Sequence, residues 1–280
     1  MTASLRTELL KLRKRPSTWI LGAILVFVVV FFDYFQFYSS VASLEEGGND
    51  PTGQIRNVEE FKQYLLPGSF TVNVPGLLSQ FGGPVALILG ALAAGSEYGW
   101  GTVKTALTQG LGRIKVLLSK LLAVGIVLAV FTVLVLGTGA VASYVVAGLL
   151  EEAVEWPSIG NILQAFGVTW LIFGAWASLG IFLAMLFRST ALAIGLGLVW
   201  GLVVENLIFG FSEQSEIIDA LTNILLITNG GTLANSLGNP PQAFTAPDPA
   251  EPIQTLIVLL VYLVGLLLLA TLLFRQRDVA

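Results

Sequence analysis

Histidine and cysteine are both absent from this 280-residue chain. The absence of cysteine excludes disulfide frameworks and thiol catalysis, and the two absences together exclude the common zinc sites and haem ligation. Without histidine there is no Ser-His hydrolase mechanism, and the commonest general base is missing as well. The composition therefore argues against an enzymatic function.

Charge is also scarce. Charged residues make up 11% of the chain, hydrophobic residues make up 55%, and the mean hydropathy is +0.83. Soluble domains carry about 25% charged residues, so most of this surface does not face water. Long apolar runs between polar stretches predict a single membrane-embedded unit over residues 1–280, an all-α integral membrane protein. The net charge of −4 argues against a nucleic-acid partner.

Six apolar stretches are long enough to cross the roughly 30 Å hydrocarbon core as helices, which takes about 20 residues. The predicted transmembrane helices are residues 18–37, 77–96, 121–147, 164–187, 189–210 and 253–274. The fourth and fifth would together be about 70 Å long, which exceeds any bilayer. The chain must therefore turn back between them, at Arg188-Ser189.

Basic and acidic residues fall on opposite sides of these six spans. Of the 14 Lys and Arg residues, all but Arg56 and Lys62 lie on the side of the two termini. Thirteen of the 18 Asp and Glu residues lie on the other side. The positive-inside rule then predicts that the N- and C-termini are cytoplasmic.

The polar segments carry two further helix predictions. On the acidic side, which has segments at about residues 38–76, 148–163 and 211–252, apolar residues recur at helical spacing over 212–227. This predicts an amphipathic or partly re-entrant helix, with an ordinary surface loop as the alternative. At the N-terminus, Leu5, Leu9 and Leu12 share one face of a basic segment that ends at Pro16. Their spacing predicts an interfacial amphipathic helix whose apolar side lies in the acyl boundary.

One long connection, Gly95 to Lys120, lies on the basic side between the second and third spans. Glu97 stands where the second span leaves the membrane, and Thr102–Gln109 has helical character between glycine-rich turns. A short helix with glycine hinges and basic flanks indicates a lever that is presented to a cytoplasmic partner.

This connection resembles that of the ABC-2-type permeases of ATP-driven exporters. The similarity rests on an acidic residue, a Gly-Thr pair, a Leu-Thr pair and basic residues before the next span, here Glu97, Gly101-Thr102, Leu107-Thr108, Arg113 and Lys120. The segments Glu8–Arg13 and Phe274–Val279 are also similar to the ends of that family's chains.

The resemblance implies a cytoplasmic coupling loop that docks on a separate ATP-binding subunit. The residues it assigns to coupling are Glu97, Tyr98, Gly101, Thr102, Leu107, Thr108 and Arg113. It also implies that this chain pairs with a second permease chain, which is expected to be an identical copy, so that the two form a homodimer. The dimer would lie in the lipid of a bacterial inner membrane. This chain would bind no cofactor and no metal, and ATP and Mg would bind to the partner subunit.

The ATPase must be a different protein, because the chain has no G-x-x-x-x-G-K-[ST] phosphate-binding loop. The nearest similar stretch, Val103-Lys104-Thr105, lacks the glycine that this loop needs before its lysine.

Small residues repeat every four positions in two of the spans. They are Ala86, Gly90 and Ala94 in the second span, and Ala193, Gly197 and Gly201 in the fifth. Such faces let helix backbones approach closely in lipid, which predicts packing within the chain. By the family resemblance, Gly197 and Gly201 are also candidates for a dimer interface or transport pathway.

Two carboxylates lie inside spans, Asp33 in the first and Glu205 in the fifth. Intramembrane carboxylates are costly, so they are treated as functional candidates, here for the pathway or an interface. Each lies about 16 residues from the basic side, roughly 24 Å along the helix, which places it near the outer interface where solvation is cheap.

Two other functions stay open. A stand-alone ion-coupled transporter would use Glu205 to bind the ion, but such carriers usually have inverted repeats and helices broken near mid-membrane, which the sequence does not show. A lipid-modifying enzyme would need clustered carboxylates on one membrane face, and the basic side offers only Glu8, Glu97 and Asp278. The substrate is not defined: drugs, peptides, ions and lipid-like molecules all fit.

Overall fold

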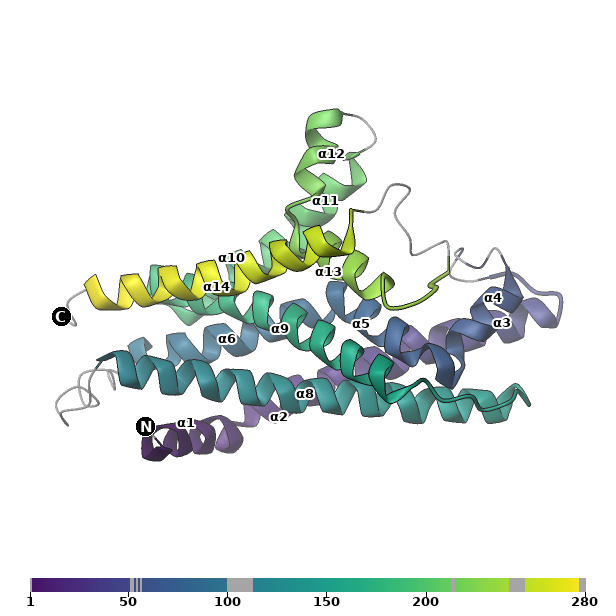
Figure 1. Ribbon diagram of the computed structural model, residues 1–280, viewed down its shortest axis with the longest axis horizontal. Helices are drawn as coiled ribbons and strands as arrows, with labels where there is room; N and C mark the ends of the chain where they lie inside the picture. Colours follow the sequence, from purple (N-terminus) through teal and green to yellow (C-terminus); the bar gives the residue numbers. More distant parts are fainter. Residues whose placement is uncertain are drawn as a thin grey trace.

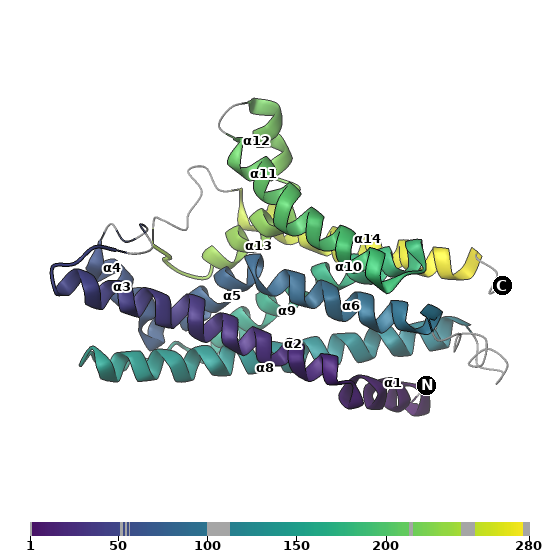
Figure 2. The same cartoon turned by 180° about the vertical axis from the view of Figure 1, so that it is seen from behind.

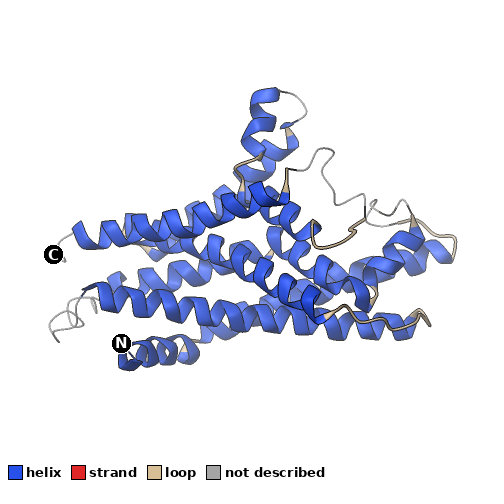
Figure 3. Ribbon diagram, viewed as in Figure 1, coloured by secondary structure: helices blue, strands red, loops and turns tan. Residues whose placement is uncertain are grey.

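The computed structural model describes residues 2–50, 53, 55, 57–99, 113–212, 215–241 and 250–276. Within these ranges the regular secondary structure is entirely helical, as Figure 3 shows. The all-α class is therefore confirmed.

The first transmembrane helix is longer than predicted. After α1 (Thr2–Lys14), the chain continues through α2 (Pro16–Val28), a π-helical segment η1 (Val29–Phe35) and α3 (Gln36–Glu45). Together these three form an apolar helix of 30 residues, Pro16–Glu45, where the sequence predicted residues 18–37. Pro16 occupies the first helical turn of α2, where its missing N–H has no helical partner to lose.

The second transmembrane segment is bent, whereas the sequence predicted one continuous helix over residues 77–96. The outer segment contains α4 (Val58–Leu65), a 3₁₀ turn η2 (Pro67–Ser69) and α5 (Phe70–Gln80), which precede α6 (Gly82–Gly99). The axis turns by 59° between Gln80 and Gly82.

Two sequence features explain this bend. Pro84 has no N–H to donate to the carbonyl of residue 80, so one helical hydrogen bond is missing at the break. Gly82 allows the close approach there, since a Cβ atom on it would lie 2.7 Å from Leu78 Cδ2 and 2.8 Å from Phe173 Cε1.

The third and fourth spans are α8 (Arg113–Leu149) and α9 (Ile159–Phe187). Arg188 ends α9 in the left-handed region, with φ 51°, and the Ser189 hydroxyl accepts a hydrogen bond from Leu192 N–H at the start of the next helix. The predicted turn at Arg188-Ser189 is confirmed. The fifth span consists of α10 (Thr190–Leu198), a second π-helical segment η3 (Val199–Val204) and α11 (Glu205–Gly210).

The amphipathic helix predicted over residues 212–227 is two helices instead. They are α12 (Glu216–Thr222) and α13 (Leu226–Asn235), and the chain then reaches the sixth span, α14 (Pro252–Gln276). Leu225 and Leu226 are buried at the break, because α13 packs against α5, α9 and α14. Figure 1 shows α13 tucked beside α5 while α12 projects from the bundle.

The spans are arranged around α6 and α9, which pack closely on each other. Trp176, Phe173 and Ile172 of α9 are among the large side chains that are fully buried. Five helices of the described residues are long and apolar enough to cross a membrane, and the bent α5–α6 pair makes a sixth.

The two ends of the bundle differ in charge. Figures 1 and 2 show α1, the end of α6, the start of α8 and the end of α14 together at one end. We call this the basic end, because α1, Lys115, Lys120, Arg188 and Arg275 lie there. We call the opposite end, where α3, α4 and the α8–α9 connection lie, the acidic end; its acidic residues are Glu45, Glu46, Glu59, Glu60, Glu151, Glu152 and Glu155.

Candidate functional site

The predicted coupling loop begins and ends at the basic end. Helix α6 runs to Gly99 and α8 starts at Arg113. All seven predicted coupling residues lie outside the described residues or have side chains that do: Glu97, Tyr98, Gly101, Thr102, Leu107, Thr108 and Arg113. Their role stays a prediction, but the helix ends that position them are described.

Arg15 binds the end of α6 directly before this loop. Its Nη1 donates to the Leu92 carbonyl at 3.1 Å, and its Nη2 donates to Ser96 Oγ at 2.9 Å. Arg15 has extended backbone (φ −79°, ψ 123°) between α1 and α2, and Pro16 then starts α2. The planar guanidinium can reach two acceptors at once. From the sequence, Arg15 has only a role as one of the basic charges that set the topology, because its acceptors are about 80 residues away.

The same end of α6 is held on a second side by α10. A Cβ atom on Gly95 would lie 2.4 Å from Thr190 Oγ1 and 3.0 Å from Thr190 Cα, so a side chain here would force the two helices to shift. Thr190 is the first residue of α10, directly after the Ser189 cap. The exit of α6 is therefore fixed between the α1–α2 junction and the start of the fifth span.

Helix α1 is present as predicted and lies along α8. Leu12 is buried, and Leu5 and Leu9 pack partly buried against the core, so these leucines contact the protein. Sequence analysis placed this apolar face in the acyl boundary and missed the contact with α8. Glu8 is also buried on α1, and its carboxylate accepts a hydrogen bond from Lys11 Nζ at 2.6 Å.

The sequence suggested that Glu205 is solvated near the outer interface. The structure shows instead that its side chain is buried, with 1% of the residue exposed. Its Oε2 accepts the Ile227 N–H at 2.8 Å, and its Oε1 accepts the Trp200 indole N–H at 2.9 Å. The N-terminus of α13 has no side-chain cap from its own segment, so Glu205 supplies that cap from the fifth span. Tyr262 of α14 donates to the Ile224 carbonyl at 2.9 Å and holds the same segment.

Asp33 is likewise buried, with 1% of the residue exposed. The prediction that it is solvated was wrong, because a helix from the following segment covers it. The Tyr64 hydroxyl of α4 is hydrogen-bonded to it. Beyond η1 the helix continues into α3, and α4 packs back on it with Phe37 and Phe61 ring centroids 5.4 Å apart. This cover could not be seen in the sequence, where residues 38–76 were expected to form an outer loop.

The small-residue stripes pack within the chain, as predicted. A Cβ atom on Gly197 would lie 2.5 Å from Leu87 Cδ1, and one on Gly201 would lie 2.4 Å from Trp176 Cη2. In the second span, Ala86, Gly90 and Ala94 are buried against neighbouring helices. The opposite face of the fifth span carries the large exposed side chains Leu192, Leu196, Val199 and Val203.

These observations define a polytopic helical membrane protein whose basic end holds the long connection between α6 and α8, with the end of α6 fixed by neighbouring helices. Within the described ranges, no group of three acidic side chains is placed to hold a metal ion. The chain belongs to the ABC-2 family transporter proteins, whose family model matches residues 2–279. No curated protein matches it. The family consists of membrane components of ABC transporters, which act with an ATP-binding subunit and are not themselves catalytic.

Proposed function

We propose that this chain is the membrane-spanning permease subunit of an ATP-driven exporter in a bacterial cell membrane. In this proposal a separate cytoplasmic subunit binds and hydrolyses ATP with Mg, and the chain supplies the route for the substrate. The family membership supports the permease role, and the lack of a phosphate-binding loop in this sequence supports an ATPase outside this chain.

The observation that carries the coupling proposal is the Arg15 contact with α6. A docking loop transmits force only if its ends are fixed to the helices that must move. Arg15 joins the exit of α6 to the α1–α2 junction, and Thr190 joins it to the fifth span. Movement of the loop between Glu97 and Arg113 would therefore reach the first, second and fifth spans together.

We infer that two permease chains assemble through the exposed face of the fifth span. Its inward face is filled by the α6 and α9 contacts of Gly197 and Gly201, so a second chain would meet the outward side chains. Leu192, Leu196 and Val203 are apolar and half-exposed there. Beside them, the small residues Ala191 and Gly195 are also exposed, and a Cβ atom on Gly195 would meet nothing within 4 Å. Because small residues let helices approach closely in lipid, this face supports a homodimer proposal.

The ion-coupled alternative is disfavoured by the hydrogen bonds of Glu205. Both carboxylate oxygens accept a hydrogen bond, from Trp200 and from Ile227. An ion would have to replace these donors, so Glu205 fits a positioning role better than a transport site.

Co-purification with the ATPase encoded in the adjacent reading frame tests the proposal. We expect tagged wild-type chain to retain this ATPase, and Arg15→Ala to retain several-fold less, because the exit of α6 loses two charge-assisted hydrogen bonds worth about 1.5–3 kcal/mol each. Arg15→Lys should be intermediate, since an ammonium lacks the two-pronged geometry. Arg6→Ala is the matched control, because Arg6 is exposed on α1 and carries the same charge.

Two results would contradict the proposal. Transport by the purified chain in liposomes without any ATPase would exclude the exporter function. Undiminished ATPase retention by folded Arg15→Ala would exclude the coupling role of the α6 exit while leaving the permease role intact.

A further inference from the structure

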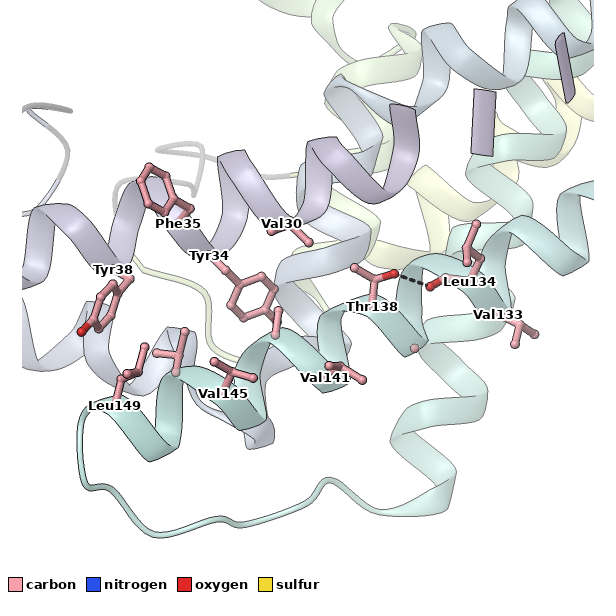
Figure 4. Close-up of a pocket in the computed structure, with 13 residues that line it drawn as sticks. Val30, Tyr34, Phe35, Tyr38, Val133, Leu134, Thr138, Val141, Val145 and Leu149 are labelled. Carbon is pink, nitrogen blue, oxygen red and sulfur yellow. Dashed lines mark hydrogen bonds between the residues drawn. The ribbon is translucent and has the colours of Figure 1, made fainter. Parts of the chain in front are cut away.

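A groove of about 700 Å³ runs along the outside of the bundle between the first and third spans. One wall is η1 with the start of α3, and the other is the second half of α8 (Figure 4). The lining side chains carry no charge. The hydroxyl of Thr138 donates to the Leu134 carbonyl at 2.8 Å within its own helix, so it offers the groove little polarity.

The groove is long, and it is open at the side. Lining residues on α8 extend from Val133 to Leu149, about 24 Å at 1.5 Å per residue. Tyr34 forms the floor and is 2% exposed, whereas Phe35 and Val141 on the two rims are 59% and 66% exposed. These residues belong to membrane spans, so the groove opens into the hydrocarbon region of the bilayer.

Aromatic side chains mark where the groove reaches the membrane surface. Tyr144 and Trp156 stack on each other with ring centroids 6.3 Å apart, and both are exposed near the acidic end of α8. Tyr and Trp gather at the level of lipid headgroups because their rings are apolar and their polar tips need water. The groove therefore begins at headgroup level, near Tyr38 and Leu149, and continues into the acyl region.

The charge at this end selects among headgroups. Glu151 and Glu152 lie two and three residues after Leu149, the last residue that lines the groove. Lys62 is the one basic side chain described at the acidic end, and Glu45 accepts a hydrogen bond from it. That bond, together with the nearby carboxylates of Glu59 and Glu152, raises the pKa of Lys62. The local field is negative, so it attracts an ammonium group and repels an anionic headgroup.

A transmembrane helix of a second copy fits this groove less well. An α-helix with its side chains is about 10 Å across, and helices approach closely in lipid where small residues line the contact. Gly137, Thr138 and Ala142 line part of this groove, but the large side chains of Val30, Phe35 and Val141 line it as well, which suits a thin, flexible chain better than a helix.

We propose that the groove binds one acyl chain of a phospholipid whose headgroup carries an ammonium group and lies at the acidic end. The proposal goes beyond the permease role and does not depend on an ATPase.

Gly137 offers a direct test, because it lines the groove and a Cβ atom on it would meet no atom within 4 Å. Gly137→Phe should place a ring in the groove from a position where the added Cβ atom has open space, and Val141→Phe should do so from an exposed rim position. The matched control is Gly265→Phe, at a glycine of α14 that also has open space around it and does not line the groove.

Each protein is reconstituted in nanodiscs that contain equal amounts of phosphatidylethanolamine and phosphatidylglycerol, and is then extracted with detergent. Retained phospholipid per chain is then counted by mass spectrometry.

We expect the wild type and Gly265→Phe to retain one phosphatidylethanolamine more than Gly137→Phe and Val141→Phe. Equal retention by all four folded proteins would overturn the proposal. Loss of phosphatidylglycerol instead would overturn the headgroup assignment. A change from dimer to monomer in both groove variants, with retained lipid unchanged, would show that a second chain occupies the groove and would also overturn it.

Discussion

Glu205 illustrates how a single buried carboxylate can join two distant segments of a membrane protein. Trp200 and Glu205 are five residues apart, which would place them on different faces of a regular α-helix. Trp200 belongs to the π-helical segment η3 and Glu205 directly follows it, and the i→i+5 hydrogen-bond pattern of this segment brings the pair to one side. The carboxylate can therefore bind the Trp200 indole and still reach the N-terminus of α13.

We expect Glu205→Ala to loosen α13. The substitution leaves the Trp200 indole and the Ile227 N–H without their acceptor, and each unpaired buried donor costs about 1–3 kcal/mol. Glu205→Gln should destabilise α13 less, because its amide oxygen can still accept one hydrogen bond. It should still have an effect, because the negative charge that favours a helix N-terminus is gone. Hydrogen exchange of the α13 amides should be fastest in Glu205→Ala, slower in Glu205→Gln and slowest in the wild type.

The control for this series is Glu155→Gln, which removes a carboxylate from an exposed position at the acidic end. Wild-type exchange rates in α13 of a folded Glu205→Ala protein would contradict the capping role.

At this scale the sequence could identify candidates but not their partners. Glu205 and Asp33 were found because carboxylates are rare in membrane spans. The cap could not be predicted, since Ile227 lies 22 residues further along the chain and the helical spacing of its segment does not show where α13 begins. Arg15 was missed because an arginine next to a membrane span is already explained by topology.

At the scale of elements, the closest packing lies between α6 and α9. A Cβ atom on Gly90 would lie 2.2 Å from the Ala177 carbonyl oxygen, and one on Gly180 would lie 2.1 Å from the Leu87 carbonyl oxygen. These neighbours are backbone atoms, so no side-chain rotation can relieve the overlap. The two helices can pack this closely only because both glycines lack a side chain.

We therefore expect Gly90→Ala and Gly180→Ala to force α6 and α9 apart. Overpacking of a core typically costs about 1–3 kcal/mol, and a backbone overlap should reach or exceed the upper value. The measurement is the midpoint of thermal unfolding in detergent, followed by tryptophan fluorescence. Both variants should unfold at a lower temperature than the wild type.

Gly167→Ala is the matched control on α9, because a Cβ atom there would meet nothing within 4 Å. It should be neutral or slightly stabilising, since alanine favours the helix by up to about 1 kcal/mol over glycine. Equal destabilisation by all three alanines would show that the effect is not a property of the α6–α9 contact.

Element boundaries were predictable where length or charge fixed them. The Arg188 turn followed from bilayer thickness, because an uninterrupted helix would have been too long. The break between α5 and α6 was not predicted although Gly82 and Pro84 are visible in the sequence, because glycine and proline are also tolerated inside continuous transmembrane helices. Likewise, α12 and α13 share a helical period across their break, and only the burial of Leu225 and Leu226 shows why the chain turns there.

At the scale of the whole molecule, charge agrees with architecture. The sequence sorted twelve basic residues to one side before any fold was known, and the described ones among them lie at the end that carries α1 and the end of α14 (Figure 1). Hydropathy and charge are independent signals. Because they agree, they predicted the fold class and showed which helix ends lie together at the basic end. Neither signal contains the inter-helix contacts, which depend on side chains far apart in sequence.

The positive-inside rule predicts the orientation in the membrane from this charge distribution. The prediction can be tested by cysteine labelling, because the chain has no cysteine that would give a background signal. Val154→Cys introduces a thiol at an exposed position of the acidic end, and Gln276→Cys introduces one at an exposed position of the basic end. Neither substitution changes a charge, so neither disturbs the positive-inside signal. A membrane-impermeant maleimide should label Val154→Cys in intact spheroplasts, but should label Gln276→Cys only after the membrane is permeabilised. Labelling of Gln276→Cys in intact spheroplasts would place the basic end outside, and the connection between α6 and α8 would then be unable to meet a cytoplasmic ATPase.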